Sequence, residues 1–238
     1  MKKSKETLKY NDYELNNMDY KKAIVNDKRT YLQYYLSLLK TKHLILFTFL
    51  PINDYNLKTL KISLFILIIS LYLTVNSFFF DDKTMHKLYI DNGDYDFIFQ
   101  IPQIIYSSVI SAIINVILKY LSLSEKKILE IKNEKVYKKS LEKSKNISKS
   151  LIIKFIVFFT LGTFLMAFFW FFLSCFCFVY RNTQIPLIKD TVCSFFLSMI
   201  YPFGLYLLPG LIRIPSLKKT KKNNKECIYK LSLFISLI

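Results

Sequence analysis

Glycine, proline, histidine and tryptophan are scarce in this sequence of 238 residues, which contains 4 Gly, 6 Pro, 2 His and 1 Trp. It has no recognisable nucleotide-binding or catalytic motif, and no pair of its four cysteines has the spacing of a zinc finger. Acidic residues are also few, with 17 Asp and Glu against 34 Lys and Arg. These absences argue against an enzyme and against a bound cofactor or metal.

Long apolar runs are what the sequence has instead. Hydrophobic residues make up 53% of the chain, including 22 Phe and 17 Tyr, which is more aromatic surface than one soluble core of this size hides. A helix needs about 20 mainly apolar residues to cross a bilayer, and four runs have about that length or more: residues 62–80, 101–121, 151–180 and 192–212. The sequence predicts an all-α, multi-pass helical membrane protein with four transmembrane helices.

The basic residues alternate in number along the chain. Lys and Arg number 11 in residues 1–59, 2 in 81–96, 9 in 122–150, 2 in 181–191 and 7 in 213–238. Because cytoplasmic segments carry the Lys and Arg excess, both termini and the central loop are predicted to face the cytosol. No cleavable signal peptide is visible, so we expect the first span to act as an uncleaved signal anchor.

The net charge of +17 raises the question of a nucleic-acid partner. Nucleic-acid surfaces interleave aromatic with basic residues, whereas here the aromatic residues lie mostly in the apolar runs. We expect no nucleic-acid partner. The lysine-rich cytosolic segments could instead contact anionic lipid headgroups.

Four parts follow from these patterns. Residues 1–28 are predicted to be a polar cytosolic tail, 29–52 an interfacial or re-entrant amphipathic helix, 53–217 the four-helix membrane domain and 218–238 a basic cytosolic tail. In residues 29–52, apolar or aromatic side chains recur with the period of a helix at Leu32, Tyr35, Leu36 and Leu39. We expect an interfacial helix with Lys40, Lys42 and His43 at the headgroups; a re-entrant segment is the alternative.

Polar side chains recur every four residues along the second span. They are Gln103, Ser107, Ser111 and Asn115, followed by Lys119. Rows of small and polar residues let membrane helices pack closely and hydrogen-bond to one another, so helix packing is the favoured interpretation. A pore or substrate path lined by the row is the alternative, and it is weakened because no Asp, Glu or Arg lies in the middle of a predicted span.

The fourth span contains two Pro-Gly combinations. They are Pro202 with Gly204 and Pro209 with Gly210. Because proline removes a backbone hydrogen bond, we expect this helix to kink. A structural kink or a helix end is favoured, and a broken helix that binds substrate, as in transporters, is the alternative.

The segments between the spans carry weaker signals. The outer segment 81–96 is rich in Asp but lacks the ligand spacing of a calcium loop, so a turn at Asn92-Gly93 among solvated acids is expected. Residues 122–150 are predicted to continue the second helix into the cytosol, with a basic surface that is solvated or binds anionic lipid. The cysteines are expected to be inert thiols, with a bridge from Cys175 or Cys177 to Cys193 as the alternative.

Several strings resemble a family of protist multi-pass membrane proteins for which no activity is known. They are DKRTYLQYYLSLLKTKHLILFTFLPINDYN at 27–56, TVNSFFFDDKTMHKLY at 74–89, IPQIIYSSVISAIINVILKYLSLSEKKIL at 101–129 and YPFGLYLLPGLIRIPSL at 201–217. The resemblance implies a membrane location. In these relatives the segment often resembles the C-terminal membrane part of a longer protein, so the chain is expected to be a short member or a fragment.

The predicted function is that of a non-enzymatic membrane module that anchors or organises partners. The alternative is a channel or transporter subunit in which the second span lines a polar path. A membrane enzyme is disfavoured because its reactive groups must gather near one interface, and His43 and His86 are predicted on opposite sides. The lipid bilayer is the one partner that the sequence itself indicates.

Overall fold

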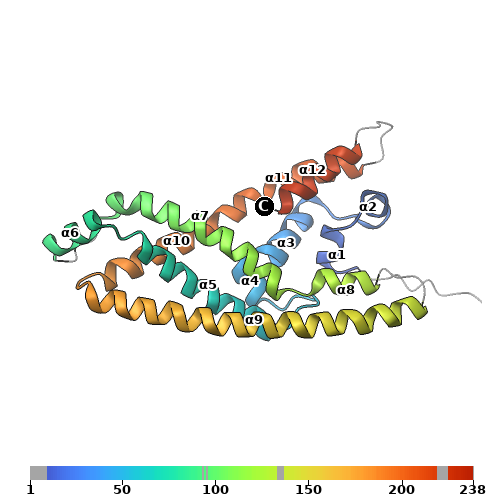
Figure 1. Cartoon of the computed structure of the whole chain (residues 1–238). Coiled ribbons are helices and arrows are strands. Elements are labelled where there is room, and N and C mark those ends of the chain that lie inside the picture. The colour runs from blue at the N-terminus through green and yellow to red at the C-terminus, as the bar shows by residue number, and fades with distance from the viewer. Residues whose placement is uncertain (1–9, 93, 95, 133–136, 219–224, 238) are drawn as a thin grey trace, which may run out of the picture. The chain divides into compact units, whose positions relative to one another are not determined.

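The structure is a computed structural model that describes residues 10–92, 94, 96–132, 137–218 and 225–237, and the regular structure in these residues is all α-helical (Figure 1). The helices are α1 (Asp12–Asn16), α2 (Tyr20–Asn26), α3 (Tyr31–Lys42), α4 (Leu44–Phe49), α5 (Lys58–Phe78), α6 (Asp82–Ile90), α7 (Phe97–Ser122), α8 (Glu125–Lys132), α9 (Tyr137–Val179), α10 (Gln184–Leu205), α11 (Leu207–Leu217) and α12 (Lys225–Leu237). Four helical segments are long and apolar enough to cross a membrane: Lys58–Phe78, Phe97–Ser122, Lys138–Val179 and Gln184–Leu217. The predicted all-helical class and the four candidate spans are confirmed.

The chain divides into two compact units. Met1–Tyr55 and Pro202–Ile238 form the first, and Asn56–Tyr201 form the second. The N-terminal and C-terminal segments, which the sequence analysis treated as separate parts, therefore fold with each other.

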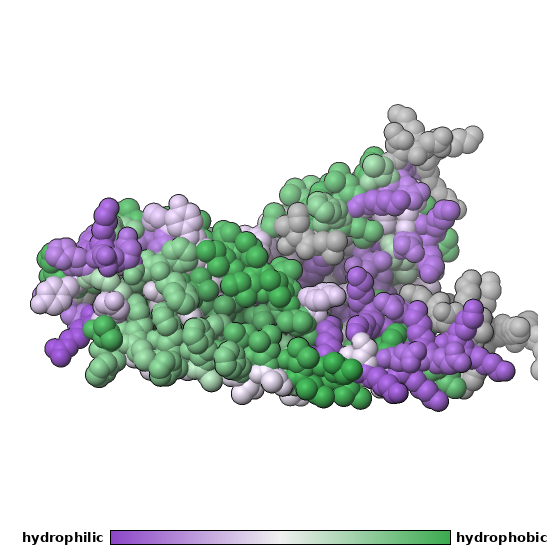
Figure 2. All heavy atoms as spheres, viewed as in Figure 1, coloured by the Kyte–Doolittle hydropathy of each residue, from purple (hydrophilic) through white to green (hydrophobic). Residues whose placement is uncertain are grey.

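In the second unit, α5 packs against both α7 and α9. Leu64 and Ile68 on α5 are fully buried, whereas most of the apolar part of α9 is exposed. Figure 2 shows hydrophobic side chains over the middle of α9 and hydrophilic ones over its N-terminal part. An exposed apolar surface of this kind is expected of a helix that faces lipid.

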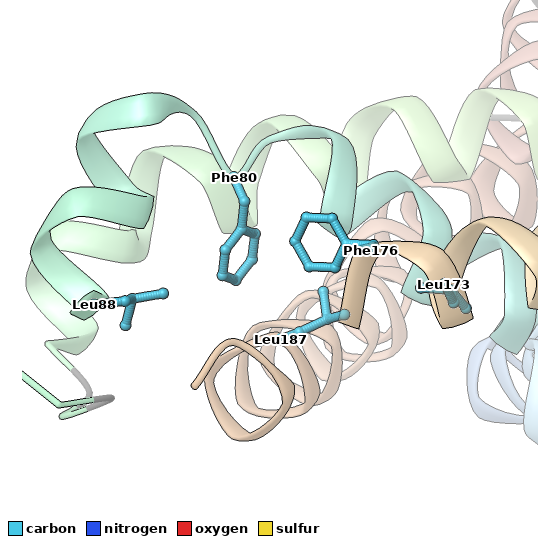
Figure 3. Packing of buried hydrophobic residues seen from close by; sticks show 5 residues of the cluster. All are labelled: Phe80, Leu88, Leu173, Phe176 and Leu187. Atoms are coloured by element: carbon cyan, nitrogen blue, oxygen red, sulfur yellow. The ribbon is translucent and has the colours of Figure 1, made fainter. Parts of the chain in front are cut away.

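The segment between the first two spans contains a helix that the sequence analysis did not foresee. The Asp81 carboxylate accepts a hydrogen bond from the Thr84 backbone N–H at 2.8 Å and caps α6. A cluster of buried apolar residues holds α6 near the ends of α9 and α10: Phe80, Leu88, Leu173, Phe176 and Leu187 (Figure 3). Asn92 has a φ of 52°, as the expected turn requires, while Gly93 lies outside the described residues.

The predicted continuation of the second helix into the cytosol is wrong. α7 ends at Ser122, and Leu123 leaves the helix with φ −84° and ψ 139°. The long extension belongs to the third candidate span instead, because α9 starts at Tyr137 and runs without a break to Val179. Residues 133–136 of the predicted continuation lie outside the described part of the chain.

In the first unit, α11 packs against α12, α3 and α2. Thr30 and Gln33 form a reciprocal capping box that starts α3. The predicted amphipathic segment 29–52 contains two helices, α3 and α4, because His43 adopts an extended backbone with ψ 122°. Tyr34, Leu38, Leu39 and Tyr206 form a buried cluster in this unit.

Candidate functional site

The polar row predicted on the second span lies on α7, and Ser107 in its middle is hydrogen-bonded to α5 and, through Asn76, to α10. The Ser107 hydroxyl donates to Asn76 Oδ1 on α5 at 2.7 Å. Asn76 Nδ2 in turn donates to Ser194 Oγ on α10 at 2.8 Å. All three side chains are fully buried. These two hydrogen bonds connect three of the candidate spans.

A second interhelical contact lies one turn earlier on α7. Gln103 Nε2 donates to Asp190 Oδ2 on α10 at 2.8 Å, and the Asp190 side chain is fully buried. The sequence analysis placed Asp190 in the outer segment before the fourth span. Because α10 already begins at Gln184, this carboxylate lies inside the helix and reaches α7.

Several buried side-chain oxygen atoms on or next to the polar row of α7 make no hydrogen bond. They are Gln100 Oε1, Gln103 Oε1, Ser111 Oγ and Asn115 Oδ1. Gln100 was not part of the predicted row and lies one turn before it. Each buried acceptor without a donor carries a desolvation cost, so these atoms are where a water molecule or a polar ligand would bind most favourably.

A cavity of about 270 Å³ lies elsewhere in the second unit, between α5 and α9. Its walls are mostly apolar and consist of Ser63, Ile66, Leu67, Phe158, Phe159, Gly162, Thr163 and Met166. None of the row residues lines it. This cavity therefore gives no support to a path along the row.

The fourth candidate span has a break at Tyr206, between the two Pro-Gly combinations, where α10 ends and α11 begins. Tyr206 keeps a helical backbone with φ −73° and ψ −6°, and the kink stays a prediction. Pro202 and Gly204 lie in the last turn of α10, and Pro209 and Gly210 lie in the first turn of α11. Proline has no N–H to donate, so Pro209 cannot complete the backbone hydrogen bond across the break.

Two tyrosine hydroxyls of α3 bind backbone carbonyls on either side of this break. Tyr35 donates to the Phe203 carbonyl and Tyr31 to the Leu207 carbonyl, each at 3.1 Å. Tyr31 and Tyr35 are four residues apart, and so are the two carbonyls that they bind. The earlier tyrosine binds the later carbonyl, so α3 runs antiparallel to this stretch. A Cβ atom on Gly210 would lie 2.7 Å from Tyr31 Cε2, which explains why glycine is required there.

A buried ionic cluster occupies the centre of the first unit. Arg213 Nη2 donates to Asp27 Oδ2 at 2.9 Å, and both side chains are fully buried. Arg213 Nε also donates to Asp27 Oδ2 at 3.3 Å, while Nη1 donates to the Asn16 carbonyl at 3.0 Å and Nη2 to the Leu15 carbonyl at 2.6 Å. The guanidinium also lies over the rings of Tyr34 and Tyr229, 4.8 and 4.7 Å from their centroids. Arg213 thereby joins α11 to the N-terminal helices.

Arg29 completes the cluster on the opposite side of Asp27. It donates to both carboxylate oxygens of Asp27, at 2.8 and 2.9 Å, and to Asn16 and Ser37. Burial alone would raise the pKa of Asp27, but the hydrogen bonds and charges of Arg29 and Arg213 outweigh it and hold this pKa below its usual value. Asp27 is therefore a charged, fully paired carboxylate.

Among the residues that the structure describes, no three His, Cys, Asp or Glu side chains are grouped to bind a metal ion. In the segment between the first two candidate spans, Asp81 and Asp96 serve as helix caps, and Asp96 also pairs with Lys87 at 2.6 Å. The four cysteines are free thiols.

No family model, curated protein or solved structure matches the chain. Two groups of residues stand out in the structure, the polar contacts of α7 and the ionic cluster of Arg213.

Sequence reasoning missed Asn76, Asp190 and Arg213, which form the central contacts of these two groups. Each had a signal, since a polar or charged side chain in or next to a long apolar run must find a partner. Arg213 directly follows the predicted fourth span, where a basic residue is expected for topological reasons alone. This expectation concealed its structural role.

Proposed function

We propose that the protein is a non-enzymatic integral membrane module that anchors or organises partners. The hydrogen bonds from Ser107 to Asn76 and from Asn76 to Ser194 carry this proposal, because they use the polar row to hold helices together. An anchoring module needs a bundle of fixed geometry. A conduit would instead turn the same polar side chains toward a water-filled path.

The proposed topology has four membrane spans with both termini and the central segment in the cytosol. Its support is the alternation of Lys and Arg, with 11, 9 and 7 of them in the three segments assigned to the cytosol and 2 in each outer segment. In this arrangement Asn92 lies outside the membrane. The basic N-terminal part of α9 and the lysines around residue 220 lie at the inner surface.

The α3 helix is proposed to lie at the cytosolic interface, as the amphipathic pattern suggested. Leu32 and Leu36 are 61% and 44% exposed and point away from the protein, as lipid-facing residues would. Lys40 is exposed as well, whereas Lys42 donates to the Ser236 carbonyl and His43 is buried against the Phe203 ring. Headgroup contact at this helix is therefore assigned to Lys40 alone among the three residues first expected there.

The lysine-rich segments are proposed to contact anionic lipid headgroups. Each Lys or Arg near a negatively charged leaflet contributes about 1 kcal/mol, so a cluster of them binds appreciably. The start of α9 offers such a cluster, with Lys138, Lys139, Lys143, Lys145 and Lys149 on an exposed helix. This contact would fix the depth of the protein in the membrane.

Protease protection in sealed cells tests the proposed topology. Tags at residues 1 and 238 should be protected from an external protease, while a tag inserted at Asn92 should be cleaved. Cleavage of either terminal tag in intact cells would exclude the arrangement. Detergent-permeabilised cells, in which all three tags are cleaved, supply the control.

A channel or transporter subunit is the second candidate. The unpaired oxygens of Gln100, Gln103, Ser111 and Asn115 favour it, since they form a row of buried acceptors on one helix. Single cysteines at Ser107, Ser111 and Asn115, in a background without the native cysteines, separate the two functions. Reaction with a small water-soluble thiol reagent, with altered ion flux in a reconstituted bilayer, would establish the conduit.

Lack of reaction at all three positions would support helix packing. Ile113 provides the matched control, because it lies on the same helix and is 61% exposed on the surface assigned to lipid. A cysteine there should react with a lipid-soluble maleimide and not with the charged reagent. This result would show that the reagents distinguish lipid from water on α7.

A further inference from the structure

The C-terminal helix α12 has an exposed apolar face that the description of residues 218–238 as a basic tail does not explain. Cys227, Leu231 and Phe234 follow the i, i+4, i+7 spacing of one helix face. Leu231 is 50% and Phe234 63% exposed, and Ile228 beside them is 45% exposed. In water this face would leave a row of large apolar side chains solvated.

The opposite face of α12 is fixed to the first unit, so the apolar face cannot turn inward. The Tyr229 hydroxyl donates to the Met18 carbonyl at 2.6 Å, and the Tyr229 ring lies under the Arg213 guanidinium. Tyr229 and Ser232 are fully buried. The rotation of α12 about its own axis is therefore set by the core of its unit.

Charged residues border the apolar face in the arrangement of an interfacial helix. Glu226 and Lys230 form an ion pair at 2.9 Å on one flank. Among the described residues, Lys218 follows α11 and Lys225 begins α12. Cationic side chains beside an apolar helix face match the phosphates that lie above the acyl chains of a lipid leaflet.

The α12 helix also packs beside a candidate membrane span. It packs against α11, the last part of the fourth candidate span, and Lys225 Nζ donates to the Lys218 carbonyl at the junction of the two helices. Leu208 and Leu211 on α11 are 48% and 60% exposed. Two adjacent helices of one unit thus both present apolar side chains outward.

We propose that α12 is a membrane-docking helix whose Cys227, Leu231 and Phe234 face enters the acyl region of the cytosolic leaflet while Lys218 and Lys225 bind lipid phosphates. This proposal rests on the membrane location argued above and extends it to a segment outside the four spans. In this proposal, lipid acyl chains cover the apolar face of α12. Water or another protein surface on this face is the contrary outcome.

Tryptophan fluorescence in vesicles with brominated acyl chains tests the proposal, because bromine quenches only tryptophan that contacts the chains. Trp170 is the sole tryptophan of the chain and lies 51% exposed on α9. The wild-type protein therefore reports membrane insertion of the third candidate span by itself. In the double variant Trp170→Phe/Phe234→Trp, the single tryptophan reports on the apolar face of α12. The double variant Trp170→Phe/Lys230→Trp places it on the charged flank of α12 and is the matched control.

Brominated phosphatidylcholine vesicles containing phosphatidylserine should reduce the emission of the Phe234→Trp protein about twofold, with a smaller decrease for Lys230→Trp. Quenching of wild-type protein but not of the Phe234→Trp protein would overturn the docking of α12 and leave the membrane proposal standing. Loss of quenching in the wild-type protein would overturn both. Circular dichroism establishes that each variant is folded, which is expected because position 234 is on the surface.

Discussion

Arg213 and Asp27 are 186 residues apart in the sequence and form an ion pair, 2.9 Å long, in which both side chains are fully buried. This pair joins the C-terminal part of the fourth candidate span to the N-terminal segment. A buried charge is costly unless it is paired and hydrogen-bonded, and here every donor group of the Arg213 guanidinium has a partner. The pair therefore ties the N-terminal and C-terminal parts of the first unit to each other.

Replacement of Arg213 by Leu should strongly destabilise the first unit. Removing one partner of a buried ion pair costs about 3–5 kcal/mol, and the lower end is expected because Arg29 still pairs with Asp27. Thermal unfolding in detergent measures the effect. Arg181→Leu is the matched control, since Arg181 is exposed and its replacement should change the unfolding temperature little; equal effects at the two positions would contradict the assigned role of the pair.

Gly210→Ala should destabilise the first unit through a steric clash. The added Cβ would lie 2.7 and 2.9 Å from two ring carbons of Tyr31, and overpacking of this kind costs about 1–3 kcal/mol. Gly204→Ala is the control, because nothing lies within 4 Å of its added Cβ. Combining Gly210→Ala with Tyr31→Ala should restore part of the lost stability, and failure of this rescue would count against the close contact.

Asn76→Leu should reduce the stability of the second unit more than Asn115→Leu does. Asn76 makes two interhelical hydrogen bonds, and such bonds in membrane proteins average about 0.6 kcal/mol each. The Asn115 carbonyl oxygen makes none. We expect a loss of about 1–2 kcal/mol for Asn76→Leu in denaturant unfolding from micelles, and a larger loss for Asn115→Leu would refute the ranking.

The stability of the first unit should fall at alkaline pH because of Tyr229. Burial raises the pKa of Tyr229 from 10.0 to about 12. Since the folded-state pKa is the higher one, the stabilisation is complete below pH 10 and is lost as the pH rises through 12. Tyr229→Phe should be less stable at neutral pH, because it lacks the hydrogen bond to the Met18 carbonyl, and should show a weaker decline in unfolding temperature between pH 10 and 12.

The helical class and the four candidate spans could be predicted because they depend on local sequence. A long apolar run is helical wherever backbone groups cannot bond to water, whatever the rest of the chain does. Helix ends were less predictable. Because Asp190 is charged, it was expected in a loop. It is instead buried within α10, where the hydrogen bond from Gln103 on α7 offsets the cost of removing its carboxylate from water.

The contacts between distant residues could not be predicted from patterns along the chain. The α6 helix was missed because its sequence is polar and its position depends on Leu88 packing with residues of α9 and α10. The apolar stripe on α3 was recognised, but its period alone could not reveal that Leu39 packs against the protein while Leu32 and Leu36 remain exposed. Which apolar residues of a helix are buried is decided by tertiary packing, and a single sequence does not show that packing.

The unbroken helix α9 gives the second unit a mechanical property. It has 43 residues from Tyr137 to Val179, and at 1.5 Å per residue it is about 65 Å long, roughly twice the thickness of a bilayer's hydrocarbon core. Its lysine-rich beginning and its aromatic end are thus parts of one rod without a hinge. Because the helix is unbroken, its lysine-rich end and Phe176 with the cluster around it lie on one continuous element.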